Sequence, residues 1–276
     1  YGNISTSGST YYVGGIVGRN YGYNSSYPTR IDYCNNYANV NGYEYVGGIA
    51  GYTYGYSSSE SYNGFVTYCV NSGEITGRYY YTGGIAGYAY YVQFRNNTNN
   101  GAVTGAGYYT AGIAGYCYYG YYQQYNINNA DITSTSYYTG GIFGYSYYNY
   151  YNQYNENRGD VTSGGLYTGG INGYNYGSNY YCRYNLNSGN VSSTSYHVGG
   201  INGYANYTYT DYCVNVGRVS STYSGNAYVG GITGYATSSS AYTSYCLNAG
   251  KVSGYTYVGG IAGEGYYGNY ISYCLN

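Results

Sequence analysis

The 276-residue sequence contains no tryptophan, no methionine, one proline and one histidine. Charged residues make up only 6% of the chain, against roughly 25% in ordinary globular domains. The formal net charge of −1 gives no basic surface for nucleic acid and no polybasic face for a membrane. No apolar run approaches the length that a transmembrane helix requires. We therefore expect neither nucleic-acid binding nor membrane insertion.

Residues that commonly carry catalysis are also scarce. The single histidine, His197, stands where the other repeats of the chain have tyrosine, which predicts a surface substitution rather than a ligand. No Ser/His/Asp set, HExxH motif or CxxC motif is present. We expect no enzymatic activity, no cofactor and no metal site.

The chain is rich instead in tyrosine and glycine, with 59 and 49 residues. It also repeats one five-residue phrase about every 30 residues: GGIVG at 14–18, GGIAG at 47–51, GGIAG at 83–87, AGIAG at 111–115, GGIFG at 140–144, GGING at 169–173, GGING at 199–203, GGITG at 230–234 and GGIAG at 259–263. A period of this size indicates a repeat architecture whose units contact only their neighbours. Residues 1–276 are therefore expected to form one continuous domain.

A second phrase lies between these copies, for example YCVNSGEI at 68–75 and YCLNAGKV at 245–252. Its alternate positions are Cys or Asn, then Asn, then Gly or Ala, then Val or Ile, a period of two that is typical of a strand with one buried face. We expect at least two strand segments per coil, one around each phrase, joined by a tyrosine-rich strand or loop. The predicted fold class is all-β: a parallel β-solenoid of about nine coils of ~30 residues, uncapped at both ends.

One position of the second phrase is asparagine in every copy. Because an amide carries both donors and an acceptor, identical asparagines stacked at strand spacing can bond each to the next. We expect an internal ladder of Asn36, Asn71, Asn99, Asn128, Asn157, Asn187, Asn215, Asn248 and Asn276.

Tyrosines recur in columns as well, such as the position directly after the GGI phrase. The residues there include Tyr52, Tyr88, Tyr116, Tyr145, Tyr174, Tyr204 and Tyr235. Rings that repeat in every coil should stack into ladders. Besides this structural role, glycan contact and lateral packing between fibres remain open.

The two ends of the sequence are complementary. The chain closes on Tyr273, Cys274, Leu275 and Asn276, the first half of the second phrase, and it opens with Tyr1, Gly2, Asn3 and Ile4, which match the second half. Neither end has a capping repeat, and an uncapped strand edge is a template for another chain. We expect a head-to-tail homopolymer whose junction completes one coil. The alternative is a fragment of a longer repeat region.

Five of the seven cysteines share one column: Cys34, Cys69, Cys213, Cys246 and Cys274. Stacked Cα atoms about 4.8 Å apart are within disulfide range, so a bond between Cys274 and Cys34 of the next copy is one interpretation. A column of small buried hydrophobic residues is the other.

Sequons occur at Asn3, Asn24, Asn96, Asn190 and Asn206. In a chain this rich in asparagine, serine and threonine such triplets also arise by chance, so glycosylation stays open.

The two phrases resemble the GLUG-motif repeats of bacterial surface proteins, in which a GG-[LI]-x-G phrase alternates with a Cys-x-Asn-x-Gly-x-Val phrase. The resemblance covers essentially the whole chain and implies a secreted or cell-surface β-solenoid of the adhesin kind. We expect a structural subunit of an extracellular filament with a tyrosine-rich surface. The alternative is the stalk or passenger of a cell-surface adhesin that binds glycans or other surfaces through tyrosine ladders.

Overall fold

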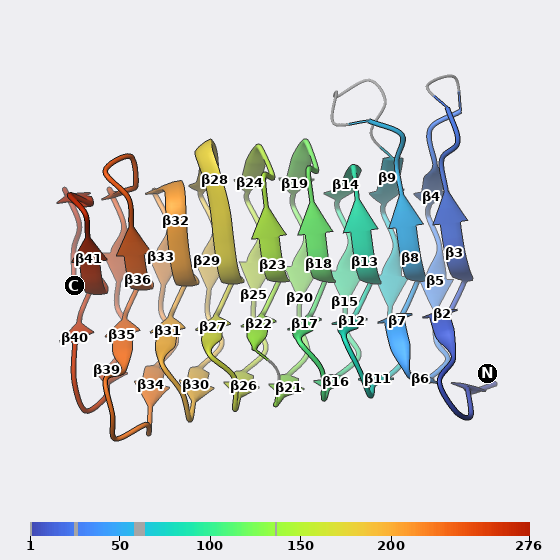
Figure 1. The fold of residues 1–276 in the computed structure, drawn as a ribbon, viewed down its shortest axis with the longest axis horizontal. Coiled ribbons are helices and arrows are strands. Elements are labelled where there is room, and N and C mark those ends of the chain that lie inside the picture. The colour runs from blue at the N-terminus through green and yellow to red at the C-terminus, as the bar shows by residue number, and fades with distance from the viewer. Residues whose placement is uncertain (1, 25–26, 58–63, 136) are drawn as a thin grey trace.

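The computed structural model describes residues 2–24, 27–57, 64–135 and 137–276. This part of the chain is all-β, and its coils stack into a parallel β-solenoid of nine coils (Figure 1). Each strand pairs in parallel with the equivalent strand of the next coil, as β12 (Tyr81–Gly83) does with β7 (Glu44–Gly47) and β17 (Tyr109–Ala111). The predicted fold class is thus confirmed. No helix is present among the described residues, so none of them forms a helical membrane span.

The strands form four sheets, named A to D in the order in which a coil passes through them. Sheet A contains β1 (Ile4–Ser5), β6 (Val40–Gly42), β11 (Ile75–Gly77), β16 (Val103–Gly105), β21 (Ile132–Ser134), β26 (Val161–Ser163), β30 (Val191–Ser193), β34 (Val219–Ser221) and β39 (Val252–Ser253). Sheet B contains β2 (Tyr11–Gly14), β7 (Glu44–Gly47), β12 (Tyr81–Gly83), β17 (Tyr109–Ala111), β22 (Tyr138–Gly140), β27 (Tyr167–Gly169), β31 (His197–Gly199), β35 (Tyr228–Gly230) and β40 (Val258–Gly259).

Sheet C takes two strand segments from each coil. The first are β3 (Val17–Tyr21), β8 (Ala50–Tyr54), β13 (Ala86–Tyr90), β18 (Ala114–Tyr118), β23 (Phe143–Tyr147), β36 (Thr233–Thr237) and β41 (Ala262–Tyr266). The second are β4 (Arg30–Asp32), β9 (Gly64–Thr67), β14 (Val92–Arg95), β19 (Tyr122–Gln124), β24 (Tyr151–Gln153), β37 (Tyr242–Ser244) and β42 (Tyr270–Ser272). In two coils one long strand supplies both segments, namely β28 (Asn172–Arg183) and β32 (Asn202–Asp211).

Sheet D consists of two-residue strands, each of which ends on the asparagine that recurs in every repeat of the chain. They are β5 (Asn35–Asn36), β10 (Val70–Asn71), β15 (Thr98–Asn99), β20 (Ile127–Asn128), β25 (Glu156–Asn157), β29 (Leu186–Asn187), β33 (Val214–Asn215) and β38 (Leu247–Asn248). A bridge between Leu247 and Leu275 continues the sheet into the last coil.

The GGI phrase forms a corner between sheets B and C, whereas the sequence predicted a strand around it. Gly84 and Ile85 lie between the end of β12 and the start of β13. A Cβ atom at Gly84 would overlap the carbonyl oxygen of Gly112 and the amide of Asn99. Glycine is therefore needed there because two coils and a side chain meet at van der Waals distance. The tyrosine-rich stretch, predicted as a strand or a loop, supplies the strands of sheet C.

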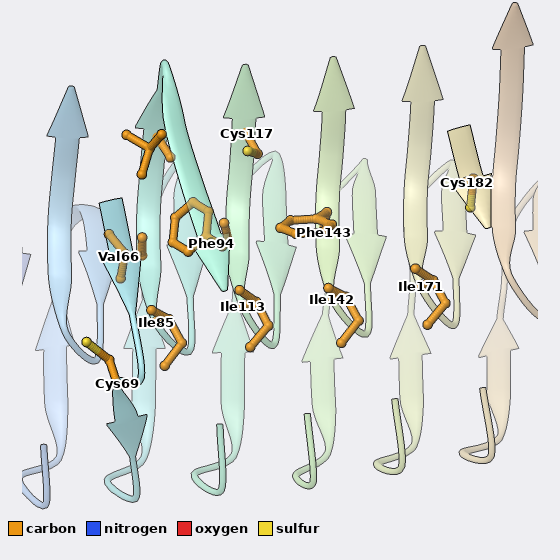
Figure 2. Packing of buried hydrophobic residues seen from close by; sticks show 14 of the residues in the cluster. Val66, Cys69, Ile85, Phe94, Ile113, Cys117, Ile142, Phe143, Ile171 and Cys182 are labelled. Carbon is orange, nitrogen blue, oxygen red and sulfur yellow. The ribbon is translucent and has the colours of Figure 1, made fainter. Parts of the chain in front are cut away.

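The interior is built from columns of equal residues. In the inner coils the isoleucines of the GGI phrase form a fully buried column, joined by Phe94, Phe143 and Cys117 (Figure 2). A second apolar cluster lies between sheets A and B and contains the Val/Ile column of sheet A, for example Val103 and Ile132. Because each layer repeats the one below, the burial that stabilises one coil is available only when a neighbouring coil covers it.

Candidate functional site: the ladders and the two end layers

The asparagine column forms an unbroken ladder through the structure. Each Nδ2 donates to the Oδ1 of the asparagine in the next coil over 2.7–2.8 Å, from Asn36 to Asn276. In the inner coils Nδ2 also donates to the carbonyl two residues further on, as Asn157 does to Gly159. All donors point toward the C-terminal coil, so the ladder has a direction.

The cysteine column is also present, and its members are free thiols. Asparagine fills the same column in the intervening coils, where the Oδ1 of Asn97 accepts from the backbone N–H of Cys69 at 3.0 Å. Burial raises the pKa of the Cys69 thiol to about 11. Cys69, Cys213 and Cys246 are small buried groups, whereas Cys34 and Cys274, in the first and last coils, are half-buried. The intermolecular Cys274–Cys34 disulfide remains a prediction.

Two tyrosine ladders run side by side along sheets B and C. Ladder B consists of Tyr12, Tyr45, Tyr81, Tyr109, Tyr138, Tyr167, His197, Tyr228 and Tyr257, with ring centroids 4.7–5.1 Å apart. Ladder C consists of Tyr52, Tyr88, Tyr116, Tyr145, Tyr174, Tyr204 and Tyr235, with centroids 4.8–5.2 Å apart. The ladders meet edge to face, as Tyr109 and Tyr116 do at 5.1 Å. Burial raises the pKa of Tyr45, Tyr138 and Tyr204 to about 12, so these phenols are uncharged at neutral pH.

A third ladder, the corner ladder, lies on the outer surface where sheet C turns into sheet D. Its members are Tyr125, Tyr154, Tyr184, Tyr212, Tyr245 and Tyr273, stacked 4.9–5.1 Å apart. Each has a positive φ between 51° and 57°, a left-handed conformation that non-glycine residues rarely adopt. In all three ladders the ring faces are covered by the rings above and below. Solvent therefore meets ring edges and hydroxyl groups, and an open ring face is found only at the ladder ends.

His197 is a member of ladder B, so its prediction as a surface substitution is wrong. The imidazole stacks between Tyr167 and Tyr228 at 4.9 and 5.1 Å, and Tyr204 and Tyr235 face it edge-on at 5.5 and 5.4 Å. Burial lowers the pKa of His197 from 6.5 to about 4, and a hydrogen bond to Leu166 offsets part of this effect. The side chain is a neutral ring that replaces one tyrosine in the stack.

This pKa predicts a loss of stability in mild acid. Below pH 6.5 the unfolded chain binds a proton at His197 that the folded chain does not bind until about pH 4. The free energy of unfolding should therefore fall by up to about 3 kcal/mol between these two pH values. Unfolding at a series of pH values, with NMR titration of the imidazole, measures the effect. His197→Tyr, which restores the residue of the neighbouring coils, should remove that part of the pH dependence; an unchanged profile would contradict the assignment.

The first and last coils leave the same columns uncovered. Ile49 is fully buried, whereas Ile16, in the same column of the first coil, is 47% exposed. In the corner position Tyr33 is 73% and Tyr273 is 75% exposed, and the neighbouring Leu275 is 69% exposed. These two surfaces, which we call the N-terminal and C-terminal end layers, are where ladders and core columns stop.

The residues of the predicted junction belong to these layers, except that Tyr1 lies outside the described residues. Ile4 begins sheet A against the second apolar cluster, and Asn276 accepts the last ladder bond next to the final bridge of sheet D. Gly2 and Asn3 are exposed, as is Tyr273, and Cys274 is half-buried. The C-terminal half of the second phrase therefore ends sheet D in the last coil, and the N-terminal half begins sheet A in the first coil. Sheet A follows sheet D along the chain, but here the two halves lie at opposite ends of the stack.

The sequon asparagines differ in exposure. Asn3 and Asn190 are exposed, whereas Asn24, Asn96 and Asn206 are half-buried. The amide of Asn190 is engaged on both sides, since Nδ2 donates to Asp160 and Oδ1 accepts from the backbone N–H of Arg218. Asp131 and Asp160 each accept a hydrogen bond from the backbone N–H of the residue in the next coil of the same column.

The described residues contain no group of three or more His, Cys, Asp or Glu side chains arranged to hold a metal ion. Comparison with family models, with curated proteins and with solved structures gave no match.

Sequence reasoning missed two charged residues of the end layers. Arg19 follows the first GGI phrase directly, and Glu264 follows the last one. Both therefore occupy the column of ladder C, which the structure confirms through the pairs Arg19–Tyr52 and Tyr235–Glu264. Both residues could have been found in the sequence by comparing the position directly after the GGI phrase in all nine copies, including the first and the last.

Proposed function

We propose that the chain is a non-enzymatic structural subunit of an extracellular filament, in which copies stack head-to-tail through their end layers. The C-terminal layer of one copy covers the N-terminal layer of the next, so the solenoid continues without a change in its coil. The resemblance to GLUG repeats supports a location outside the cell.

The observation that carries this proposal is the column-by-column match of the two end layers. In seven columns the final residue is of the same type as the first: Ile261 with Ile16, Val258 with Val13, Tyr257 with Tyr12, Tyr266 with Tyr21, Tyr273 with Tyr33, Cys274 with Cys34, and Asn276 with Asn36. Stacking would bury apolar groups that are exposed in both layers.

The direction of the asparagine ladder favours head-to-tail stacking. At the C-terminal layer Asn276 has Nδ2 hydrogens that the described residues leave without an acceptor, and at the N-terminal layer Asn36 presents Oδ1. A head-to-tail contact adds one more ladder bond, whereas a contact between two N-terminal layers sets acceptor against acceptor. An identical, non-closing contact of this kind generates an open filament.

An adhesin that stacks sugars on its tyrosines receives less support. A sugar binds an aromatic residue through the ring face, and within the ladders each face is occupied by another aromatic ring, a tyrosine or His197. The ring edges and hydroxyl groups that line the surface are suited to lateral contacts between fibres.

Electron microscopy of the purified chain tests the proposal. We expect fibres with a layer line near ~4.8 Å and an axial repeat of roughly 43 Å, the rise of nine coils. Isolated rods of that length at all protein concentrations would refute the filament and leave the chain as part of a longer repeat stalk.

A further inference from the structure

We propose that Arg19 and Glu264 form an ion pair across each junction between copies and that this pair fixes the polarity of assembly. The inference rests on the proposed filament and names the charged contact that selects its partner, a second copy of this chain. It concerns two residues that play no part in the interior of either copy.

The first step is the position of the two residues in one column. The column that contains ladder C has a tyrosine in each inner coil. Its only charged residues are Arg19 in the first coil and Glu264 in the last. The two charges are opposite. A tyrosine at either end would present an open ring face, as Tyr273 does in the corner ladder, but here each end layer carries an ionised group instead.

The second step is the way in which the aromatic residues hold the guanidinium group. The Cζ atom of Arg19 lies 5.0 Å from the ring centroid of Tyr21, 5.4 Å from Tyr12 and 5.5 Å from Tyr52. Cation–π contacts of this length attract the guanidinium to the ring faces. These contacts place the positive charge beside Tyr52, the first ring of ladder C, on the side that faces the N-terminal end layer.

The Glu264 carboxylate occupies the corresponding position at the C-terminal end layer. Glu264 pairs in register with Tyr235 and is half-buried. Burial and, after it, the Glu264 carboxylate raise the pKa of Tyr235, which places the negative charge beside the last phenol of the ladder.

Neither charge has an opposite charge of its own within the described chain. The ion pairs found there join Arg30 to Asp32, Glu156 to Arg158, and Arg183 to Asp211. Arg19 and Glu264 are therefore available for a contact outside the copy that contains them.

Head-to-tail stacking brings the two together. Residues that share a column in successive coils are about 4.8 Å apart at Cα, and both side chains are long enough to meet over that distance. Contact between two N-terminal layers would instead bring together two surfaces that each carry an unpaired arginine, and contact between two C-terminal layers would bring together two surfaces that each carry an unpaired glutamate. Like charges brought together in an interface are unfavourable, so the pair discriminates against both wrong orientations.

Charge reversal provides the test. Arg19→Glu puts a carboxylate at both ends of a copy, and Glu264→Arg puts a guanidinium at both ends. We expect each variant to fold normally by circular dichroism and to need a concentration about ten- to a hundredfold higher than the wild type to form fibres. An equimolar mixture of the two should assemble near the wild-type concentration, because every junction in an alternating copolymer again joins opposite charges.

Matched controls make the same two kinds of charge reversal at exposed positions away from the end layers. Arg218→Glu and Glu74→Arg alter exposed residues of inner coils and should leave assembly unchanged. Gold labelling of one variant in the mixture should show strict alternation along the fibre. High salt should narrow the difference between the wild type and each single variant.

The outcomes separate the two proposals. If the wild type forms fibres and either single variant forms them equally well, the ion pair is wrong while the filament stands. If the folded variants fail to assemble even as a mixture, the ion pair is also wrong. If the wild type remains as isolated rods, both proposals fall.

Discussion

Replacing Gly141 with alanine is expected to lower the free energy of unfolding by about 4 kcal/mol or more. Gly141 lies at a GGI corner, where a Cβ atom would overlap the carbonyl oxygen of Gly170 and the amide of Asn157. The overlapping atoms belong to the backbone of the next coil and to the asparagine ladder, so neither can move without breaking the contact between coils. Because the residue lies in the middle of the stack, the defect divides the solenoid into two shorter ones.

Chemical unfolding followed by circular dichroism measures this loss. Gly164→Ala is the matched control, since the nearest atom to a Cβ there is 3.7 Å away, an ordinary contact. Equal stability of the two variants would show that the coils can separate at the corner, contrary to the close approach described above.

Replacing Asn157 with alanine is expected to cost about 3–6 kcal/mol. The substitution removes the acceptor of Asn128 Nδ2 and the donor to Asn187 Oδ1, both at 2.8 Å. It also removes the donor to the carbonyl of Gly159. One N–H of Asn128, the Oδ1 of Asn187 and the carbonyl of Gly159 then lose this partner, although Asn128 Nδ2 keeps its bond to the Ala130 carbonyl. Each unsatisfied group costs about 1–3 kcal/mol.

Asn129→Ala is the control for the ladder. Its Nδ2 donates to Asn100 Oδ1 at 2.7 Å, but on the exposed side of the same turn, where water can replace the bond. Thermal and chemical unfolding of the two variants should differ by several kcal/mol. If both lose stability equally, the ladder contributes no more than a surface hydrogen bond.

The repeat made much of the fold predictable. Nine copies of one phrase fix the number of coils, and a position that is asparagine in every copy leaves one structural explanation, a ladder along the stack. The division into four sheets was not predictable from the same pattern. A two-residue strand such as β20 is too short to show alternation, and corners such as Gly84–Ile85 are set by contacts with other coils.

Residues that depart from their column were the hardest to predict. His197 reads as a polar substitution, yet its ring stacks like the tyrosines that it replaces. Cys117 and Cys182 lie outside the cysteine column, and their environment depends on the interior. Cys117 contacts Asn149 at 3.3 Å, and Cys182 accepts from Asn185 at 3.3 Å. These partners come from positions whose orientation the repeat period alone does not give.

The parallel stacking of the coils has a mechanical consequence. Hydrogen bonds between successive coils run along the stack, so a pull on the ends of a filament is shared by all the strands of a layer at once. When two coils inside one copy separate, the polypeptide still connects them, and the unfolded segment can extend under the load. A junction between copies has no such covalent connection when Cys274 and Cys34 are free thiols. In the proposed filament the end layers would therefore set the force at which the fibre breaks, and we expect tension to fracture it into whole numbers of subunits.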